Sequence, residues 1–185
     1  MGKPKALLPH ADGVTTFVAH AIRTARAAGV ENILVVARPD DRALMGEVTR
    51  EDAAVVINAE PERGQLSSLL AGLDEAVRRF DADAVIVMPV DVPMVTPEGV
   101  RRLLDRAASV TAPIVRASAG GRHGHPVIFK RGVFAELRDA SPSVGAKAVV
   151  HRDPARVLDV DIGDPGVALD VDTPDDYRRA FGRPL

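Results

Sequence analysis

AVIVMPVDVPMVTPE, residues 84–98, is the stretch of this sequence that decides its fold. Residues 84–88 form a continuous apolar run rich in β-branched side chains, which is typical of a strand buried on both faces. The Thr-Pro-Glu sequence at 96–98 begins a helix, because Thr caps it, Pro suits the first helical position and Glu complements the positive end of the dipole. The stretch therefore predicts a strand, a loop and a helix, with Asp91 at the mouth of the strand.

Similar units lie on both sides of this stretch. The predicted strands cover residues 33–36, 54–57, 84–88, 113–115, 127–129 and, as an edge strand, 157–160; the predicted helices cover 15–28 and 67–80 and begin at 96 and 173. Strands that alternate with helices indicate right-handed crossovers and a mostly parallel sheet. We expect an α/β fold with a doubly wound sheet, one domain over residues 1–185, and ligands beyond the carboxyl ends of the strands.

Composition narrows the classes of partner. The chain has 185 residues, no cysteine, 3% aromatic residues and a formal net charge of -2. The balanced charge gives no reason to expect nucleic acid or a membrane surface as partner. The missing cysteines exclude disulfides, thiolate zinc sites and a cysteine nucleophile. The N-terminus has no apolar run long enough for a signal peptide or a membrane span, so we expect a cytoplasmic protein.

Two loops have features suited to phosphates. Gly2 would allow a close approach of the backbone to a phosphate, and Lys5 offers three donors and a point charge, although a solvated terminus would look the same. Between a predicted strand and helix, Gly64 permits an unusual backbone conformation, and Ser67 and Ser68 lie where free backbone N–H groups point outward. The simpler alternative there is an ordinary turn with a serine cap.

Acidic residues suggest a cation. Asp91 at the end of a parallel strand is placed to hold a divalent cation, or it may simply form an Asx turn before the next helix. Asp170 and Asp172 would point the same way in an extended segment. Two such carboxylates repel each other without a cation, which favours a metal site.

We expect residues 120–126 to form a flexible, glycine-rich loop with basic groups. His123 and His125 alternate, but they lack a third ligand for a metal, and His125 also fits a structural donor. Arg122 could meet an acceptor phosphate or be solvated.

Four ordered blocks of this sequence resemble motifs of the MobA/MocA-like nucleotidyltransferases. They are MGKPKALL at residues 1–8, PVDVP at 89–93, GHP at 124–126 and DVDTPDD at 170–176. Residues 58–68 also resemble a family segment that contacts base and ribose, and SVGAK at 143–147 resembles one with Arg where Lys147 stands. The resemblance implies a Rossmann-like fold of the nucleotide-diphospho-sugar transferase type.

The resemblance also implies an activity: magnesium-dependent transfer of CMP or GMP from CTP or GTP to a molybdopterin-type phosphate acceptor, with release of pyrophosphate. A molybdoenzyme would be a further partner. The implied residues are Lys5 and Asp91 for catalysis; Gly2, Lys5, Asn58, Gly64, Ser67 and Ser68 for the nucleotide; Arg122, Gly124 and His125 for the acceptor; and Asp91 with Asp170 or Asp172 for Mg²⁺. Two alternatives stay open: a non-catalytic accessory protein that binds nucleotide or cofactor, and a sugar or isoprenoid cytidylyltransferase.

One departure from the family concerns the N-terminus. The family's first strand and its L-A-A-G-x-S-x-R loop would precede Met1. A start assigned too late, a true truncation, or replacement by another segment or chain would each explain this. Because the first strand of such a sheet is central, its loss would leave two neighbouring strands with unpaired backbone groups. We expect an N-terminally truncated domain whose natural form is longer, and weak or no transferase activity from this chain alone.

Overall fold

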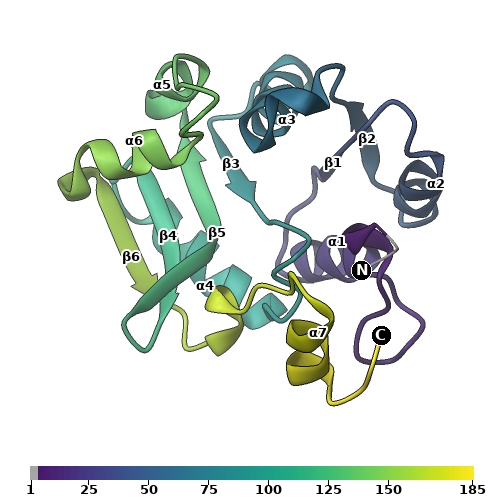
Figure 1. Ribbon diagram of the computed structural model, residues 1–185. Helices are drawn as coiled ribbons and strands as arrows, with labels where there is room; N and C mark the ends of the chain where they lie inside the picture. Colours follow the sequence, from purple (N-terminus) through teal and green to yellow (C-terminus); the bar gives the residue numbers. More distant parts are fainter. Residues whose placement is uncertain (1–3) are drawn as a thin grey trace.

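The computed structural model describes residues 4–185 as an α/β fold whose strands form two hydrogen-bonded sheets (Figure 1). Gly2 lies outside the described residues. The strands are β1 (Leu34–Ala37), β2 (Ala54–Ile57), β3 (Ala84–Val87), β4 (Ile114–Ala119), β5 (Arg122–Lys130) and β6 (Val157–Asp161). β1 and β2 pair in parallel, and the larger sheet has the order β3-β5-β4-β6. β4 and β6 are parallel. β5 is antiparallel to both of its neighbours and is the described strand that departs from the expected parallel arrangement.

Helices follow most of the predicted starts. The α-helices are α1 (Phe17–Ala27), α2 (Arg42–Arg50), α3 (Gln65–Phe80), α4 (Pro97–Ala108), α5 (Phe134–Arg138), α6 (Lys147–Arg152) and α7 (Pro174–Phe181). Thr96 accepts a hydrogen bond from the backbone of Gly99, and Thr173 forms a capping box with Asp176, so both predicted caps are confirmed. α2, α5 and α6 were not expected. Among residues 4–185, no helix is both long and apolar enough to cross a membrane.

The expected single sheet is divided in two. In the described part of the chain, β1 is paired with β2 alone and β3 with β5 alone. α3 contacts strands of both sheets and lies between them in Figure 1. Its residue Leu73 is fully buried in the core beside the larger sheet, while Gly72 faces Val36 of β1. Packing on one long helix therefore joins the two sheets.

The larger sheet is covered on both faces. Alternate residues of its strands enter two different apolar clusters, because successive side chains of a strand point to opposite faces. Ile114 and Phe129 pack with residues of α3, α5 and α6, whereas Val115 and Ile128 pack with α4 and with a 3-10 turn, η5 (Pro165–Ala168). This layered arrangement leaves the strand ends as the place for polar side chains.

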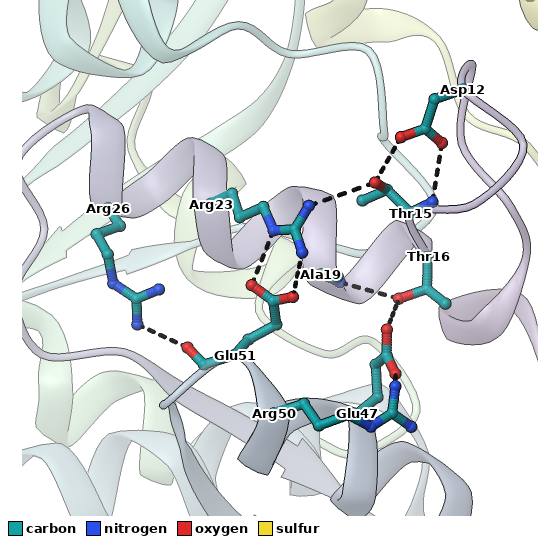
Figure 2. Close-up of polar contacts among 9 residues, drawn as sticks. All are labelled: Asp12, Thr15, Thr16, Ala19, Arg23, Arg26, Glu47, Arg50 and Glu51. Atoms are coloured by element: carbon teal, nitrogen blue, oxygen red, sulfur yellow. Dashed lines mark hydrogen bonds and ion pairs between the residues drawn. The ribbon is translucent and has the colours of Figure 1, made fainter.

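A polar network joins α1 to α2 (Figure 2). Thr16 caps α1 by accepting from the backbone of Ala19 at 3.2 Å, and its hydroxyl donates to the buried Glu47 of α2 at 2.8 Å. Arg23 makes a two-pronged contact with Glu51. These contacts fix α1, and with it the loop that precedes α1.

That loop is also tied to the C-terminal helix. The hydroxyl of the fully buried Tyr177 donates to the carbonyl of Pro9 at 2.8 Å. His10 lies 3.0 Å from the carbonyl of Pro93 through Nε2 and stacks on His20 with ring centroids 3.8 Å apart. The segment before α1 is thereby held against the loop that follows β3.

His20 makes the fold sensitive to acid. Burial, with a smaller effect from nearby His10, lowers the pKa of His20 from 6.5 to about 4. The unfolded chain takes up this proton near pH 6.5 and the folded chain only near 4, so stability is present above pH 6.5 and is lost as pH falls through that window.

Because His20 is only part-buried, we expect His20→Asn to reduce the acid-dependent loss of stability by about 1 kcal/mol. Urea unfolding between pH 7 and 4.5 measures it; His151→Asn, exposed on α6, is the control, and parallel pH profiles of wild type and His20→Asn would contradict the prediction.

Gly124 allows a close approach between β5 and η5. A Cβ atom at Gly124 would lie 1.8 Å from the carbonyl oxygen of Val167. The space is closed by backbone on both sides, so no flexible side chain can move away. Gly124 is therefore required by the fold, a reason that is independent of any ligand.

Replacing Gly124 tests this contact. We expect Gly124→Ala to lower the free energy of unfolding by about 3 kcal/mol, since η5 must move away from the sheet. Gly46→Ala is the control: Gly46 lies inside α2 with open space around it, so the change should be neutral or stabilising by about 1 kcal/mol. Denaturant unfolding compares them, and a Gly124→Ala protein as stable as wild type would exclude the close contact.

Candidate functional site

Lys5 joins two of the predicted acidic residues. Its Nζ lies 3.4 Å from Oδ2 of Asp91 and in shorter contact with Oδ1 of Asp172. The hydrogen bond to Asp172, together with the charge of Asp91, raises the pKa of Lys5 above its usual value of 10.5, although part-burial acts against this. The side chains are 35%, 30% and 59% exposed for Lys5, Asp91 and Asp172, so the cluster is open to solvent and to a ligand.

Backbone contacts hold this cluster together. Lys5 begins a 3-10 turn, η1 (Lys5–Leu7), whose next residue, Leu8, is fully buried. Asp91 follows β3, and its carbonyl accepts from the backbone N–H of Val171 at 2.7 Å. Val171 is buried and its neighbours Asp170 and Asp172 are exposed, so the extended segment turns both carboxylates outward. Three segments far apart in the sequence therefore meet at one place.

Asp170 acts on a different neighbour. Its charge, with that of Asp91, favours the protonated form of His125, but the burial of His125 is the larger effect and lowers the pKa of the imidazole. Nδ1 of His125 is buried without a hydrogen-bond partner in the described protein. Among residues 4–185, no three His, Asp or Glu side chains gather as one metal-binding group. Of the three carboxylates predicted to hold a metal, those of Asp91 and Asp172 contact the ammonium of Lys5.

A second group of predicted residues surrounds Asn58. Asn58 is 4% exposed, and its Nδ2 donates to the hydroxyls of Ser67 at 2.8 Å and Ser68 at 3.0 Å. Its Oδ1 accepts from the backbone of Glu60 at 2.9 Å. Gly64 between them has a φ of 87°, which favours glycine. The predicted residues do come together, and their mutual hydrogen bonds shape the loop.

Two depressions flank this loop. One, of about 390 Å³, is lined by residues that include Arg38, Asp41, Asn58, Gly64 and Ser68. The other, of about 310 Å³, is also lined by Asn58 and includes Arg63, Ser67 and Arg138. Arg38 was missed by sequence reasoning, although its place directly after β1 is the same signal that identified Asp91.

The predicted acceptor residues lie on one strand, β5, but have different surroundings. Gly120 and Gly121, with φ of 55° and 79°, form the two-residue turn between β4 and β5, so the segment expected to be a loop is a hairpin. Arg122 is exposed beside this turn. Gly124 packs on the backbone of Val167, and His125 is largely buried beside the acidic cluster. The charge of exposed Lys147 also reaches His125.

The sequence of this chain matches a known protein family. The family model described as MobA-like NTP transferase domain matches residues 1–157. The chain belongs to this family. Family membership places the chain among nucleotidyltransferases and confirms the resemblance found in the sequence motifs.

Relatives of this MobA-like chain have names of two reaction classes. A nicotine blue oxidoreductase of Paenarthrobacter nicotinovorans is 29% identical over 176 residues, 92% of this chain and 84% of the relative. A phosphoenolpyruvate guanylyltransferase of Streptosporangium roseum is 34% identical over 129 residues, 66% of this chain and 53% of the relative.

Solved structures support the fold. The crystal structure of Rv0371c from Mycobacterium tuberculosis H37Rv is 31% identical with a TM-score of 0.80, covering 99% of this chain and 91% of that one. A complex of Rv0371c with manganese is 30% identical with a TM-score of 0.78, covering 98% and 94%.

The Asn58 network gives a test of how this MobA-like chain builds its loop. We expect Asn58→Ala to lower the free energy of unfolding by about 1–3 kcal/mol, because it removes the hydrogen bonds that this buried side chain makes to the backbone of Glu60 and to the hydroxyls of Ser67 and Ser68. Asn32→Ala, at an exposed position before β1, is the control and should change little. Urea unfolding measures both, and equal stability of the two variants would mean that Asn58 does not hold the loop.

Proposed function

We propose that this chain is a divalent-metal-dependent nucleotidyltransferase that transfers CMP or GMP from CTP or GTP to a phosphate acceptor of the molybdopterin type, with release of pyrophosphate. The observation that carries the proposal is the meeting of Lys5, Asp91 and Asp172 beyond the end of β3. Two carboxylates and one ammonium from three remote segments are the charges that a metal–triphosphate complex requires.

The carboxylate pair suits Mg²⁺ or Mn²⁺. Both are hard cations that prefer carboxylate oxygens, and Mg²⁺ commonly takes one or two carboxylates and completes its shell with waters and substrate phosphates. Asp91 and Asp172 already approach one positive group, so their oxygens fit a cation at that point. Asp170, exposed on the same segment, is the alternative second ligand.

The reaction asks for positioning and charge stabilisation. A phosphate oxygen of the acceptor attacks the α-phosphorus of the NTP, the bond to the bridging oxygen breaks, and pyrophosphate leaves. Lys5 neutralises charge on the phosphates as it develops, and the bound cation would supply Lewis-acid stabilisation of the same charge. No side-chain nucleophile is needed.

Two further groups of residues are proposed to bind the substrates. The loop shaped by Asn58, Gly64, Ser67 and Ser68 lies beside depressions large enough for part of a nucleotide. Gly2 would add backbone contacts to the phosphates. His125, Gly124 and Arg122 lie along β5, where Lys147 adds positive charge near His125. An anionic acceptor is consistent with the positive charges of Arg122 and Lys147, and a molybdoenzyme would receive the product.

Three other functions remain as outcomes of the test. A non-catalytic carrier would bind nucleotide without turnover, and a sugar or isoprenoid cytidylyltransferase would use a different phosphate acceptor. The oxidoreductase name of one relative adds a redox reaction to be assayed. An acceptor screen that detects released pyrophosphate separates the transferases from the rest.

Asp91→Asn tests the transferase directly. We expect it to reduce pyrophosphate release at least 100-fold, because the amide keeps the shape of the side chain and removes the charge that holds the metal. Asp175→Asn is the matched control: Asp175 is 77% exposed on α7 and pairs with Arg178.

The outcomes differ between the candidate functions. If Asp175→Asn retains turnover and Asp91→Asn loses it, the transferase is supported. Nucleotide binding without any pyrophosphate release, from wild type and Asp91→Asn alike and also when each carries the family's L-A-A-G-x-S-x-R segment before Met1, would favour the carrier.

A further inference from the structure

The position of Lys5 raises a question of charge balance. Asp91 and Asp172 approach each other closely enough to contact the same ammonium, and two carboxylates in that arrangement repel unless a cation lies between them. The chain itself supplies this cation, the ammonium of Lys5. The same point is where the proposed function places a divalent metal, so Lys5 and the metal compete for the same oxygens.

We propose that Lys5 is an internal counter-cation, which holds the Asp91–Asp172 pair closed and releases it to a divalent metal only when nucleotide phosphates bind the ammonium. The inference rests on the proposed function and adds a coupling between the two ligands. A metal ion that binds without nucleotide has a lower affinity for the site, because Lys5 competes for the same carboxylates. When a triphosphate arrives with it, the phosphates give Lys5 a new partner and free the carboxylates.

The structure allows Lys5 to make this exchange. Its backbone is fixed, because its carbonyl accepts from the N–H of the buried Leu8 at 3.0 Å and Ala6 and Leu7 pack against the core of α1 and α2. The Lys5 side chain is about one-third exposed, and its ammonium is on a flexible four-carbon stem. The ammonium can therefore change direction while the backbone of η1 stays in place. Asp172 is more than half exposed, which leaves room for the incoming groups.

The carboxylates, in contrast, are held in place. The backbone N–H of Val171 donates a hydrogen bond to the carbonyl of Asp91, so the two acidic segments stay together when the Lys5 ammonium moves to the phosphates. Asp176 accepts from the backbone N–H groups of Asp172 at 3.2 Å and Thr173 at 2.8 Å, which fixes the start of α7. Lys5 is therefore the movable member of the cluster.

Coupling of this kind is reciprocal. If nucleotide strengthens metal binding by relieving Lys5, the metal strengthens nucleotide binding by the same factor. Removing the ammonium should abolish the competition. It should tighten the binding of metal alone and reduce the further gain that nucleotide brings.

Mn²⁺ titrations followed by electron paramagnetic resonance test the proposal without any measurement of turnover. We expect Lys5→Met, which keeps the length of the side chain and removes its charge, to bind Mn²⁺ alone about tenfold more tightly than wild type. A non-hydrolysable CTP or GTP analogue should then enhance Mn²⁺ binding by about tenfold less than in wild type. Arg178→Met is the control with the same change of net charge, since Arg178 is exposed on α7 and pairs with Asp175; it should behave as wild type.

The double variant Lys5→Met/Asp172→Asn should lose the tighter binding of Mn²⁺ alone that Lys5→Met shows, because one of the two freed carboxylates is gone. Unchanged or weaker binding of Mn²⁺ alone to Lys5→Met overturns the counter-cation role. If Lys5→Met binds Mn²⁺ alone no more tightly than wild type, while wild type binds Mn²⁺ in the presence of nucleotide, the counter-cation role is overturned and the proposed function stands. If neither protein binds Mn²⁺ with or without nucleotide, both proposals are overturned.

Discussion

The structure depends on the return of the chain across the end of the larger sheet after β6. The buried Asp164 accepts hydrogen bonds from the backbone of Thr96 at 2.7 Å and of Gly166 at 2.9 Å, so one carboxylate joins this segment to the start of α4. Further along, the backbone of η5 packs on Gly124, and Val171 bonds to Asp91. These contacts hold the segment that carries Asp172 against the larger sheet and against the loop that follows β3.

The candidate site is therefore a product of tertiary structure. Lys5, Asp91 and Asp172 come from the beginning, the middle and the end of the chain, and each is positioned by a different device: a 3-10 turn on a buried leucine, a strand end and an extended segment around a buried valine. A site assembled in this way forms only when α1, the larger sheet and α7 are all in place. Changes in packing far from the three charges can then alter the distances between them.

The sequence predicted the parts that have strong local signals. Apolar β-branched runs located the buried strands, and Thr-Pro starts located α4 and α7, because these signals act within a few residues. The antiparallel β5 was not foreseen, since Gly120 and Gly121 were interpreted as a flexible loop although they form a hairpin turn. The short helices α5 and α6 carry too few residues for a clear period. Neither the role of Asp164 nor the contact of Gly124 with η5 could be predicted, because both depend on segments that are distant in sequence.

Under the proposed function, charge explains why the cluster contains a lysine as well as two aspartates. A pair of carboxylates alone binds a cation but repels a triphosphate, and a lysine alone attracts the triphosphate but binds no metal. With two carboxylates, one ammonium and one divalent cation, a single positive charge is left over to attract the phosphates. The chain as a whole has a net charge of -2, so this attraction has to come from the local arrangement of charges. An ammonium that first neutralises the acids and then the phosphates meets both requirements with a single side chain.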